Sequence, residues 1–311
     1  METPDANERK RIIMRINNNV TAINSHRQYG INNNNISKNM EKLSSGFRIN
    51  RAADDAAGLA ISEKMRAQIR GLNQASRNSQ DAVSLVQTAE GGMQAVQDIL
   101  QRMRELSVQS ANDTNQNEVD REALHLELEQ LIKEIDDISA TTEFNKMQLL
   151  DGTRSGGESI VVQAGANHGQ TMSISISSVS SQGLGLALGT PDEVADMVDA
   201  DGNITGAVDE GKINIQARNA SEASIAIIDR ALNCISMQRA QLGAFQNRLE
   251  FKIQNLNNQA ENVAAAESRI RDADMAKMMT DFTKNNILFQ ASTAMLAQAN
   301  SMPQSVLQLL G

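Results

Sequence analysis

Apolar residues recur three and four positions apart along most of this chain, most regularly between Ser221 and Asn300. This stretch contains no proline and one glycine, Gly243. The spacing is typical of a long amphipathic helix rather than of a strand. At about 1.5 Å per residue, an unbroken helix of this length would extend roughly 120 Å, several times the diameter of a compact domain. We therefore expect a rod that packs against partners of similar length.

The same periodicity predicts three helical segments nearer the N-terminus. Residues 14–50 carry the first, with Gly46 as a stop signal and a run of four asparagines that makes the helix weak in isolation. The second covers 63–112, with two adjacent glycines as its weak point, and the third covers 117–140. The short polar link between these two suits an antiparallel hairpin. Residues 51–62 mix small side chains with two adjacent aspartates, and we expect a bend there rather than a metal site.

The middle of the chain has a different pattern. Eleven of the nineteen glycines lie between Gly152 and Gly211. Apolar and polar residues alternate at 160–162 and again at 172–176, which predicts two short strands joined by a turn. Residues 183–211 are glycine-rich and acidic without clear periodicity. We expect them to form a surface insertion with short strands, or a partly mobile loop.

Composition supports an elongated, mainly α protein. The chain has no Trp, one Tyr and six Phe, which gives little aromatic bulk for one globular core. Its only prolines are Pro4, Pro191 and Pro303, so residues 5–190 are permissive for long helices. The expected fold is a long antiparallel coiled-coil or helical-bundle rod built from both chain ends, with a small β-hairpin region in the middle.

Charge and side-chain chemistry exclude several classes of function. The net charge of −9, two thirds of it between residues 151 and 220, argues against nucleic-acid binding. No apolar run is long enough for a membrane span or a signal peptide. No HExxH, GxSxG or Walker motif occurs, so we expect no enzyme activity and no cofactor. Cys234 is expected to be a small residue beside the helix seam, and His125 a residue of a polar helix face.

One spacing in the middle resembles a calcium loop. Asp199, Asp201, Asn203 and Glu210 stand at ligand positions of that template. The template requires glycine at its sixth position, where this chain has Ile204. We therefore favour a solvated turn, and expect no metal site.

Both ends of the chain contain motifs of a known family. The N-terminal part has MRINNNVTAINSHRQ, KLSSGFRINRAADDAAGLAISEKMRAQIRGL, QRMRELSVQSAN and EFNKMQLLDG; the C-terminal part has GAFQNRLE, ESRIRDADMAK and QASTAMLAQANSMPQSVLQLL. With these motifs, in this order, the chain resembles bacterial flagellin, in a short form with little or no outer variable domain.

The resemblance implies a domain map. It places an N-terminal extension at 1–13, disordered or from a mis-called start; a core helix at 14–50; rod helices and a β hairpin at 51–182; a short acidic variable insertion at 183–220; the C-terminal rod helix at 221–274; and a C-terminal core helix at 275–311. The two core helices would pair and line a filament, folding only when neighbouring subunits bury their seams. The assembly residues implied are Ile16, Val20, Ile23, Met40, Leu43, Leu288, Met295, Leu296, Val306, Leu307, Leu309 and Leu310.

The resemblance also implies partners and a location. The chain would form a homopolymer for swimming motility, secreted through the flagellar type III apparatus without a cleaved signal peptide. Its other partners would be an export chaperone, the hook-filament junction and cap proteins, and a host Toll-like receptor that senses flagellin. The receptor-binding residues implied are Leu100, Gln101, Arg102, Leu106 and Glu127, although Leu100 and Leu106 fit a helix seam equally well. The apolar C-terminal tail resembles the segment read by an intracellular flagellin sensor.

Three other functions compete with this interpretation. A hook-filament junction protein has related ends, but the agreement at ESRIRDADMAK and AMLAQAN disfavours it. A chemoreceptor-like signalling coiled coil should bring a membrane span. An enzymatic flagellin should bring a catalytic motif in the middle, where HExxH is missing.

Overall fold

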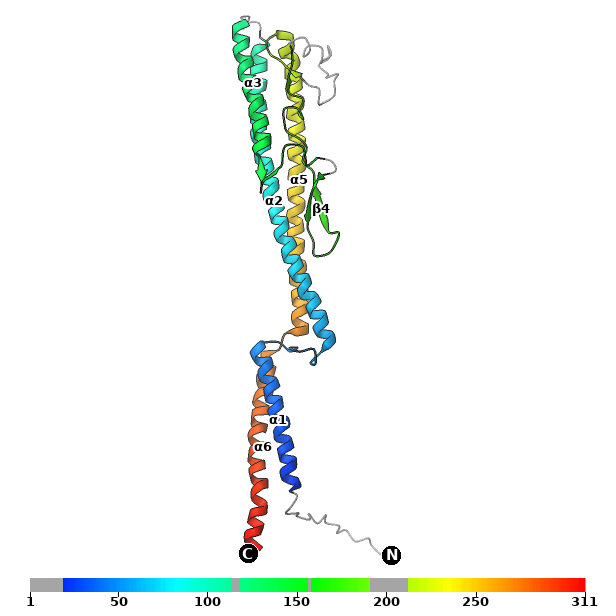
Figure 1. Ribbon diagram of the computed structural model, residues 1–311, viewed down its shortest axis with the longest axis vertical. Helices are drawn as coiled ribbons and strands as arrows, with labels where there is room; N and C mark the ends of the chain where they lie inside the picture. The colour runs from blue at the N-terminus through cyan, green and yellow to red at the C-terminus, as the bar shows by residue number, and fades with distance from the viewer. Residues whose placement is uncertain (1–18, 113–117, 156–157, 191–211, 311) are drawn as a thin grey trace, which may run out of the picture. The chain divides into compact units, whose positions relative to one another are not determined.

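The fold is mainly helical, as the sequence predicts. The computed structural model describes residues 19–112, 118–155, 158–190 and 212–310 (Figure 1). In these ranges the helices are α1 (Val20–Ser45), α2 (Ala56–Ser110), α3 (Glu118–Thr141), α5 (Arg218–Arg271) and α6 (Met275–Leu310). The predicted N-terminal extension and Ile16 lie outside the described residues.

Six short strands form three two-stranded sheets in the described part of the chain. Strands β1 (Glu143–Phe144) and β2 (Met147–Gln148) pair antiparallel, as do β3 (Ile160–Gln163) and β4 (Thr171–Ile174). The second pair confirms the hairpin predicted from alternation, although Ile176 lies beyond its end. Strands β5 (Ala187–Leu188) and β6 (Lys212–Ile213) pair in parallel.

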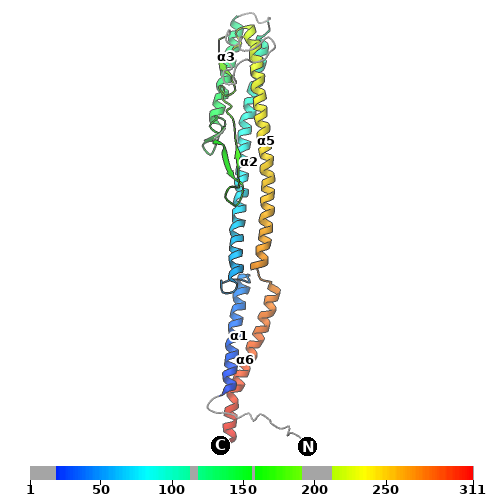
Figure 2. The ribbon, with the colours of Figure 1, turned by 90° about the vertical axis from the view of Figure 1, so that its right-hand side faces the viewer.

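The described chain divides into two compact units. Residues 19–66 and 263–310 form the first, here called the terminal unit, and residues between 67 and 262 form the second, the central unit. In the terminal unit, α1 and α6 lie side by side (Figure 2). Helix α1 ends as predicted at Gly46, whose positive φ of 74° closes the last turn through an N–H bond to the Lys42 carbonyl.

The expectation of one unbroken helix from Ser221 to Asn300 is wrong. The chain leaves the helix at 272–274, between α5 and α6. There the Ala273 N–H donates to the Gly46 carbonyl at 3.0 Å, and the Arg48 N–H donates to the Arg271 carbonyl at 2.7 Å. The Asp274 carboxylate then accepts the Ala276 N–H at 3.0 Å and starts α6 as an N-cap. The break thus depends on a partner segment more than 200 residues away.

Helix α2 begins earlier than predicted and is not interrupted. Residues 51–54 form the expected bend, but the Asp55 carboxylate accepts the Gly58 N–H at 2.8 Å and caps a helix that starts at Ala56. Small residues therefore do not prevent the helix at 56–62. The adjacent glycines at 91 and 92 lie within α2 as well.

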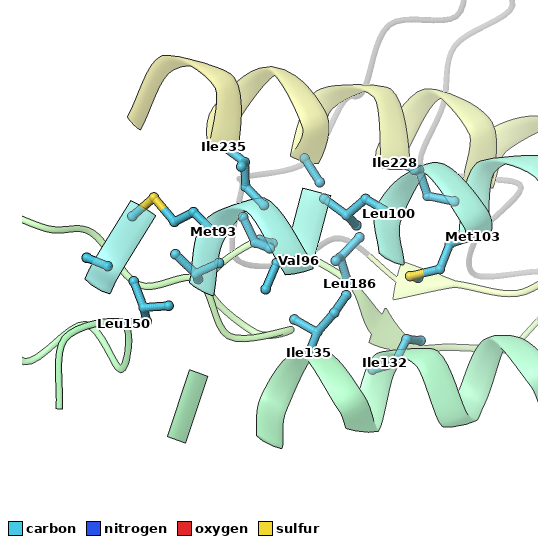
Figure 3. Packing of buried hydrophobic residues seen from close by; sticks show 14 of the residues in the cluster. Met93, Val96, Leu100, Met103, Ile132, Ile135, Leu150, Leu186, Ile228 and Ile235 are labelled. Carbon is cyan, nitrogen blue, oxygen red and sulfur yellow. The ribbon is translucent and has the colours of Figure 1, made fainter. Parts of the chain in front are cut away.

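The central unit has one large apolar core. Helices α2, α3 and α5 surround it, and Figure 3 shows their side chains meeting there. Met93, Val96 and Leu100 come from α2, Ile135 from α3, and Ile235 from α5. All five side chains are fully buried. Because each helix contributes a stripe of three-and-four spacing, the predicted seam is what fills this core.

The expectation that residues 183–211 form a surface insertion is wrong at its N-terminal end. Leu184 and Leu186 are buried, and Ile213 and Ile215, which follow this segment, are buried as well. Leu186 lies among the α2 and α3 side chains in Figure 3. The sequence shows no detectable alternation of apolar and polar residues in these two strands, because β5 and β6 are only two residues long. Residues 191–211, including the calcium-like spacing at 199–210, lie outside the described residues.

Candidate assembly surface and receptor patch

Polar side chains of α1 set its register against α6. The Asn19 amide donates to the Ala299 carbonyl at 2.7 Å. The Asn32 amide donates to Ser292 Oγ at 2.7 Å. The rings of Tyr29 and Phe289 also pack against each other, with centroids 5.0 Å apart and planes tilted by 34°. The contacts pair early residues of α1 with late residues of α6, so the helices run antiparallel. Asparagine makes α1 weak as an isolated helix, but in the pair it specifies the alignment of α1 with α6.

The α1–α6 pair buries very little apolar surface. Of the hydrophobic side chains described in the terminal unit, only Ile49 and Ala299 are buried. Helix α1 has no buried residue at all. Among the predicted assembly residues, Val20 is 61% exposed, Ile23 63% and Met295 61%. Two helices with so small a core need further apolar contacts to be stable.

The remaining predicted assembly residues occupy the same pair of helices. Met40 and Leu288 are exposed, whereas Leu43 and Leu296 are half-buried. Val20, Leu288 and Met295 line an open, mainly apolar groove that runs between α1 and α6. Helix α6 continues to Leu310, but the side chains of Val306, Leu307, Leu309 and Leu310 lie outside the described part of the chain. The structure therefore brings the described members together on one unit.

A cluster at the break between α5 and α6 was missed by sequence reasoning. The Phe47 ring lies between two guanidinium groups, with Arg271 4.9 Å and Arg66 5.7 Å from its centroid. Arg271 pairs with Glu63, and Arg66 lies 3.5 Å from Glu267. Cation–π contacts of this kind hold 46–48 against 271–273. No local pattern could reveal the cluster, because its members are up to about 220 residues apart in the chain.

The five predicted receptor residues separate into two groups. Leu100 and Leu106 are fully buried in the central core, so a receptor cannot contact their side chains in the folded unit. Gln101, Arg102 and Glu127 are exposed. The Arg102 guanidinium bridges α2 and α3, with Glu127 at 2.8 Å, and also reaches Glu105 at 3.1 Å. The hydrogen bond to Glu127 raises the pKa of Arg102.

A second exposed ion pair lies close to this patch in sequence. Arg104, also on α2, contacts Asp229 of α5 at 2.6 Å. Its exposure resembles that of the Arg102–Glu127 pair. Exposed pairs of this type contribute little to stability, because water screens the two charges. Through these two ion pairs, α2 presents charged side chains both beside α3 and beside α5.

The structure offers few other candidates for a reactive or metal-binding site in its described residues. Cys234 is half-buried and packs against the core, which agrees with its expected place beside the seam. His125 is half-buried rather than on a fully polar face. Within the described ranges, no three His, Cys, Asp or Glu side chains are grouped as a metal site requires. None of the described helices is long and apolar enough to cross a membrane.

Comparison with known proteins assigns the family. Residues 16–155 match the N-terminal helical region of bacterial flagellin, and residues 225–310 match its C-terminal helical region. The chain belongs to the flagellin family. It is 53% identical over 297 residues to a flagellin of Halalkalibacterium halodurans and 50% identical over 314 residues to a flagellin of Bacillus subtilis. Each alignment covers 96% of this chain and 100% of the relative.

Another relative carries a filament name, and one solved structure shares the fold. A flagellar filament 33 kDa core protein of Treponema phagedenis is 47% identical, over 96% of this flagellin and 100% of that protein. A putative flagellar hook-associated protein of Vibrio parahaemolyticus, 17% identical, superposes with a TM-score of 0.53 over 70% of this chain and 100% of that one. That likeness concerns the fold alone. As a flagellin, the protein is structural and not an enzyme.

Proposed function

We propose that this flagellin is a structural subunit that polymerises into the bacterial flagellar filament, which serves swimming motility. The observation that carries the proposal is the exposed apolar surface of the terminal unit, where Val20, Ile23 and Met295 remain open. A second copy of the same chain is the natural partner, because relatives close in sequence are named filament core proteins. Subunit contacts would supply the burial that the α1–α6 pair lacks.

Coupled folding follows from the same observation. Among the described apolar side chains of α1 and α6 only Ala299 is buried, so the pair gains too little free energy to offset its conformational entropy. In the proposal, residues 14–50 and 275–311 become stably folded only when neighbouring subunits pack against them. The core helices of the implied domain map are thus assigned to the filament interior, and the central unit to the surrounding rod.

The test is seeded polymerisation of the full chain, followed by electron microscopy. We expect Ile23→Asp to abolish elongation, because a carboxylate would enter an apolar subunit contact without a partner. The matched control is Val119→Asp, which changes a side chain of comparable or greater exposure on α3 of the central unit. The control should elongate normally. Equal loss in both variants, or normal filaments from Ile23→Asp, would contradict the assignment of assembly to the terminal unit.

The proposal extends to export and to flagellar partners. An unfolded terminal unit is compatible with secretion through the narrow flagellar type III apparatus, and the absence of disulfides, with one cysteine in the chain, allows the same route. An export chaperone would cover the C-terminal apolar residues before assembly. Hook-filament junction and cap proteins would contact the subunits at the filament ends. These partners rest on family membership.

We further propose that the exposed part of the receptor patch binds a flagellin-sensing Toll-like receptor. Its support is the arrangement of Gln101, Arg102 and Glu127, which come from two helices and lie together at the surface. Leu100 and Leu106 would support the patch from below through core packing. They do not supply contact atoms.

Charge reversal separates receptor binding from stability. Arg102→Glu should reduce receptor signalling by about tenfold or more, because three carboxylates would then face the bound receptor. Arg104→Glu is the matched control, since it breaks an ion pair of similar exposure on the same helix. Signalling by a receptor reporter cell line and thermal unfolding would be measured for both variants. An unchanged response to Arg102→Glu, with Arg104→Glu also unchanged, would refute the site.

A further inference from the structure

Two sets of methionines in this protein differ in exposure. Met93 and Met103 are fully buried in the core of the central unit (Figure 3). The terminal unit instead carries exposed thioethers: Met40 is 56% exposed, Met275 47%, Met279 52%, Met295 61% and Met302 44%. These five are called the terminal methionines below. Oxidation by peroxides depends on access to the sulfur, so the two groups differ in reactivity.

The terminal methionines belong to the apolar surface of the α1–α6 pair. Met295 lines the groove with Val20 and Leu288. Met275 and Met279 are one helical turn apart on α6, so their side chains share one side of that helix. Methionine suits such a surface because its flexible thioether fits irregular apolar contacts. The same atom is the one that an oxidant converts into a polar group.

We propose that the terminal methionines are a redox modification site that blocks subunit assembly when hydrogen peroxide oxidises them. This inference rests on the proposed filament function. A sulfur lone pair attacks the peroxide, the O–O bond breaks, one oxygen atom becomes bonded to sulfur as the sulfoxide, and the other leaves as water. The thioether is oxidised and the peroxide is reduced, so no further reactant is required. The product is polar and chiral, and it is reversible only by enzymatic reduction.

Oxidation would act on the free subunit and spare the filament. In the free chain the sulfurs are open to solvent, whereas neighbouring subunits would cover them after assembly. A sulfoxide oxygen buried in an apolar subunit contact would lack a hydrogen-bond partner, which is costly. The oxidised subunit is thereby excluded from elongation, while subunits already assembled keep their thioethers.

The experiment uses the full chain treated with hydrogen peroxide before seeding. Peptide mass mapping should find oxygen on the terminal methionines and none on Met93 or Met103. The critical concentration for elongation should rise by about tenfold or more, since burying an unpaired polar group typically costs at least the free energy of one decade in an equilibrium constant. In preformed filaments, Met295 should resist oxidation under the same conditions.

Two variants make the assignment specific. A chain with all five terminal methionines replaced by leucine should elongate equally well with and without peroxide. The matched control is Met237→Leu, which removes a 67% exposed methionine from α5 of the central unit and should leave the sensitivity of the wild type unchanged. Normal elongation of the oxidised wild type, or equal sensitivity of the five-leucine chain, would overturn the inference. Failure of the untreated wild type to elongate on seeds would instead overturn the filament function, and this inference with it.

Discussion

At the scale of single residues, burial decides properties that sequence position leaves open. His125 lies on α3, where a helical wheel would place it among polar neighbours, yet its Nδ1 is buried and has no hydrogen-bond partner among the described residues. Removal from solvent disfavours the charged imidazolium. Desolvation therefore lowers the pKa of His125 from its ordinary value of 6.5, and the Coulomb attraction of Glu129 opposes the shift only in part.

The lowered pKa of His125 predicts a pH dependence of stability. Because the unfolded chain binds the proton more readily than the folded chain, the contribution is fully present above the unfolded pKa of 6.5 and is lost as the pH falls through the lower, folded-state pKa. The midpoint of thermal unfolding should therefore drop between about pH 7.5 and pH 5, and His125→Gln should reduce that drop.

Circular dichroism at several pH values would measure this effect. The control is His168→Gln, which changes an exposed histidine in the loop between β3 and β4. It should leave the pH dependence as in the wild type. A pH dependence that is identical in His125→Gln and in the wild type would contradict the role of His125.

At the scale of the element, α2 shows why a helix can pass through two adjacent glycines. Gly91 has open space around the position of a side chain. Gly92 does not, because an added Cβ would lie 2.8 Å from both Leu150 Cδ1 and Thr142 Oγ1. Leu150 is fully buried and cannot move aside freely. The second glycine therefore permits close packing of the segment after α3, and core contacts offset the poor helix propensity of both.

The two glycines should respond to alanine in opposite directions. Gly91→Ala should stabilise the protein by about 0.5–1 kcal/mol, since it removes the helix-interior penalty at an open site. Gly92→Ala should destabilise it by about 1–2 kcal/mol, because the methyl group overpacks the core. Urea unfolding of the two variants measures the difference directly. Equal stabilisation by both substitutions would show that the segment around Leu150 yields without cost.

At the scale of the whole molecule, the described chain is two units that differ in the size of their apolar core. The central unit has a continuous core that includes both flanks of the expected insertion, Leu186 on one side and Ile213 on the other. The terminal unit has almost no core of its own. This difference supports the proposal that the central unit folds by itself and that the terminal unit mediates assembly.

The extent of the dispensable segment follows from that core. Replacing residues 191–211 by a Gly/Ser linker of about eight residues should leave stability and filament formation intact. A flexible linker of this length can still connect the end of β5 to the start of β6, so the two strands can pair as before. Removing residues 183–211 should instead lower the free energy of unfolding by several kcal/mol, roughly the sum for two buried leucines. Thermal unfolding and electron microscopy would compare the two deletions. Loss of assembly with the shorter deletion would place 191–211 within the assembling part of the molecule.

The sequence by itself determined the helices, the hairpin at 160–174 and the family, because each is written in local periods or in contiguous motifs. Gly46 ended α1 as predicted, since a left-handed cap is a property of one residue. The sequence also placed Arg102 and Glu127 in one candidate site, through its resemblance to flagellin. These features need no knowledge of distant parts of the chain.

Only the tertiary structure decided which contacts break the long C-terminal helix near the boundary that the resemblance implied, which residues beside 191–211 are core, and which receptor residues are accessible. The break at 272–274 depends on backbone bonds to Gly46 and Arg48. The cluster around Phe47 joins residues from three separate segments. The helical spacing allowed Leu100 and Leu106 to be either seam or contact residues, and their burial in the core decided between the two. The physical reason is common to all three: burial and long-range pairing depend on which segments meet in space, and a local pattern does not fix that.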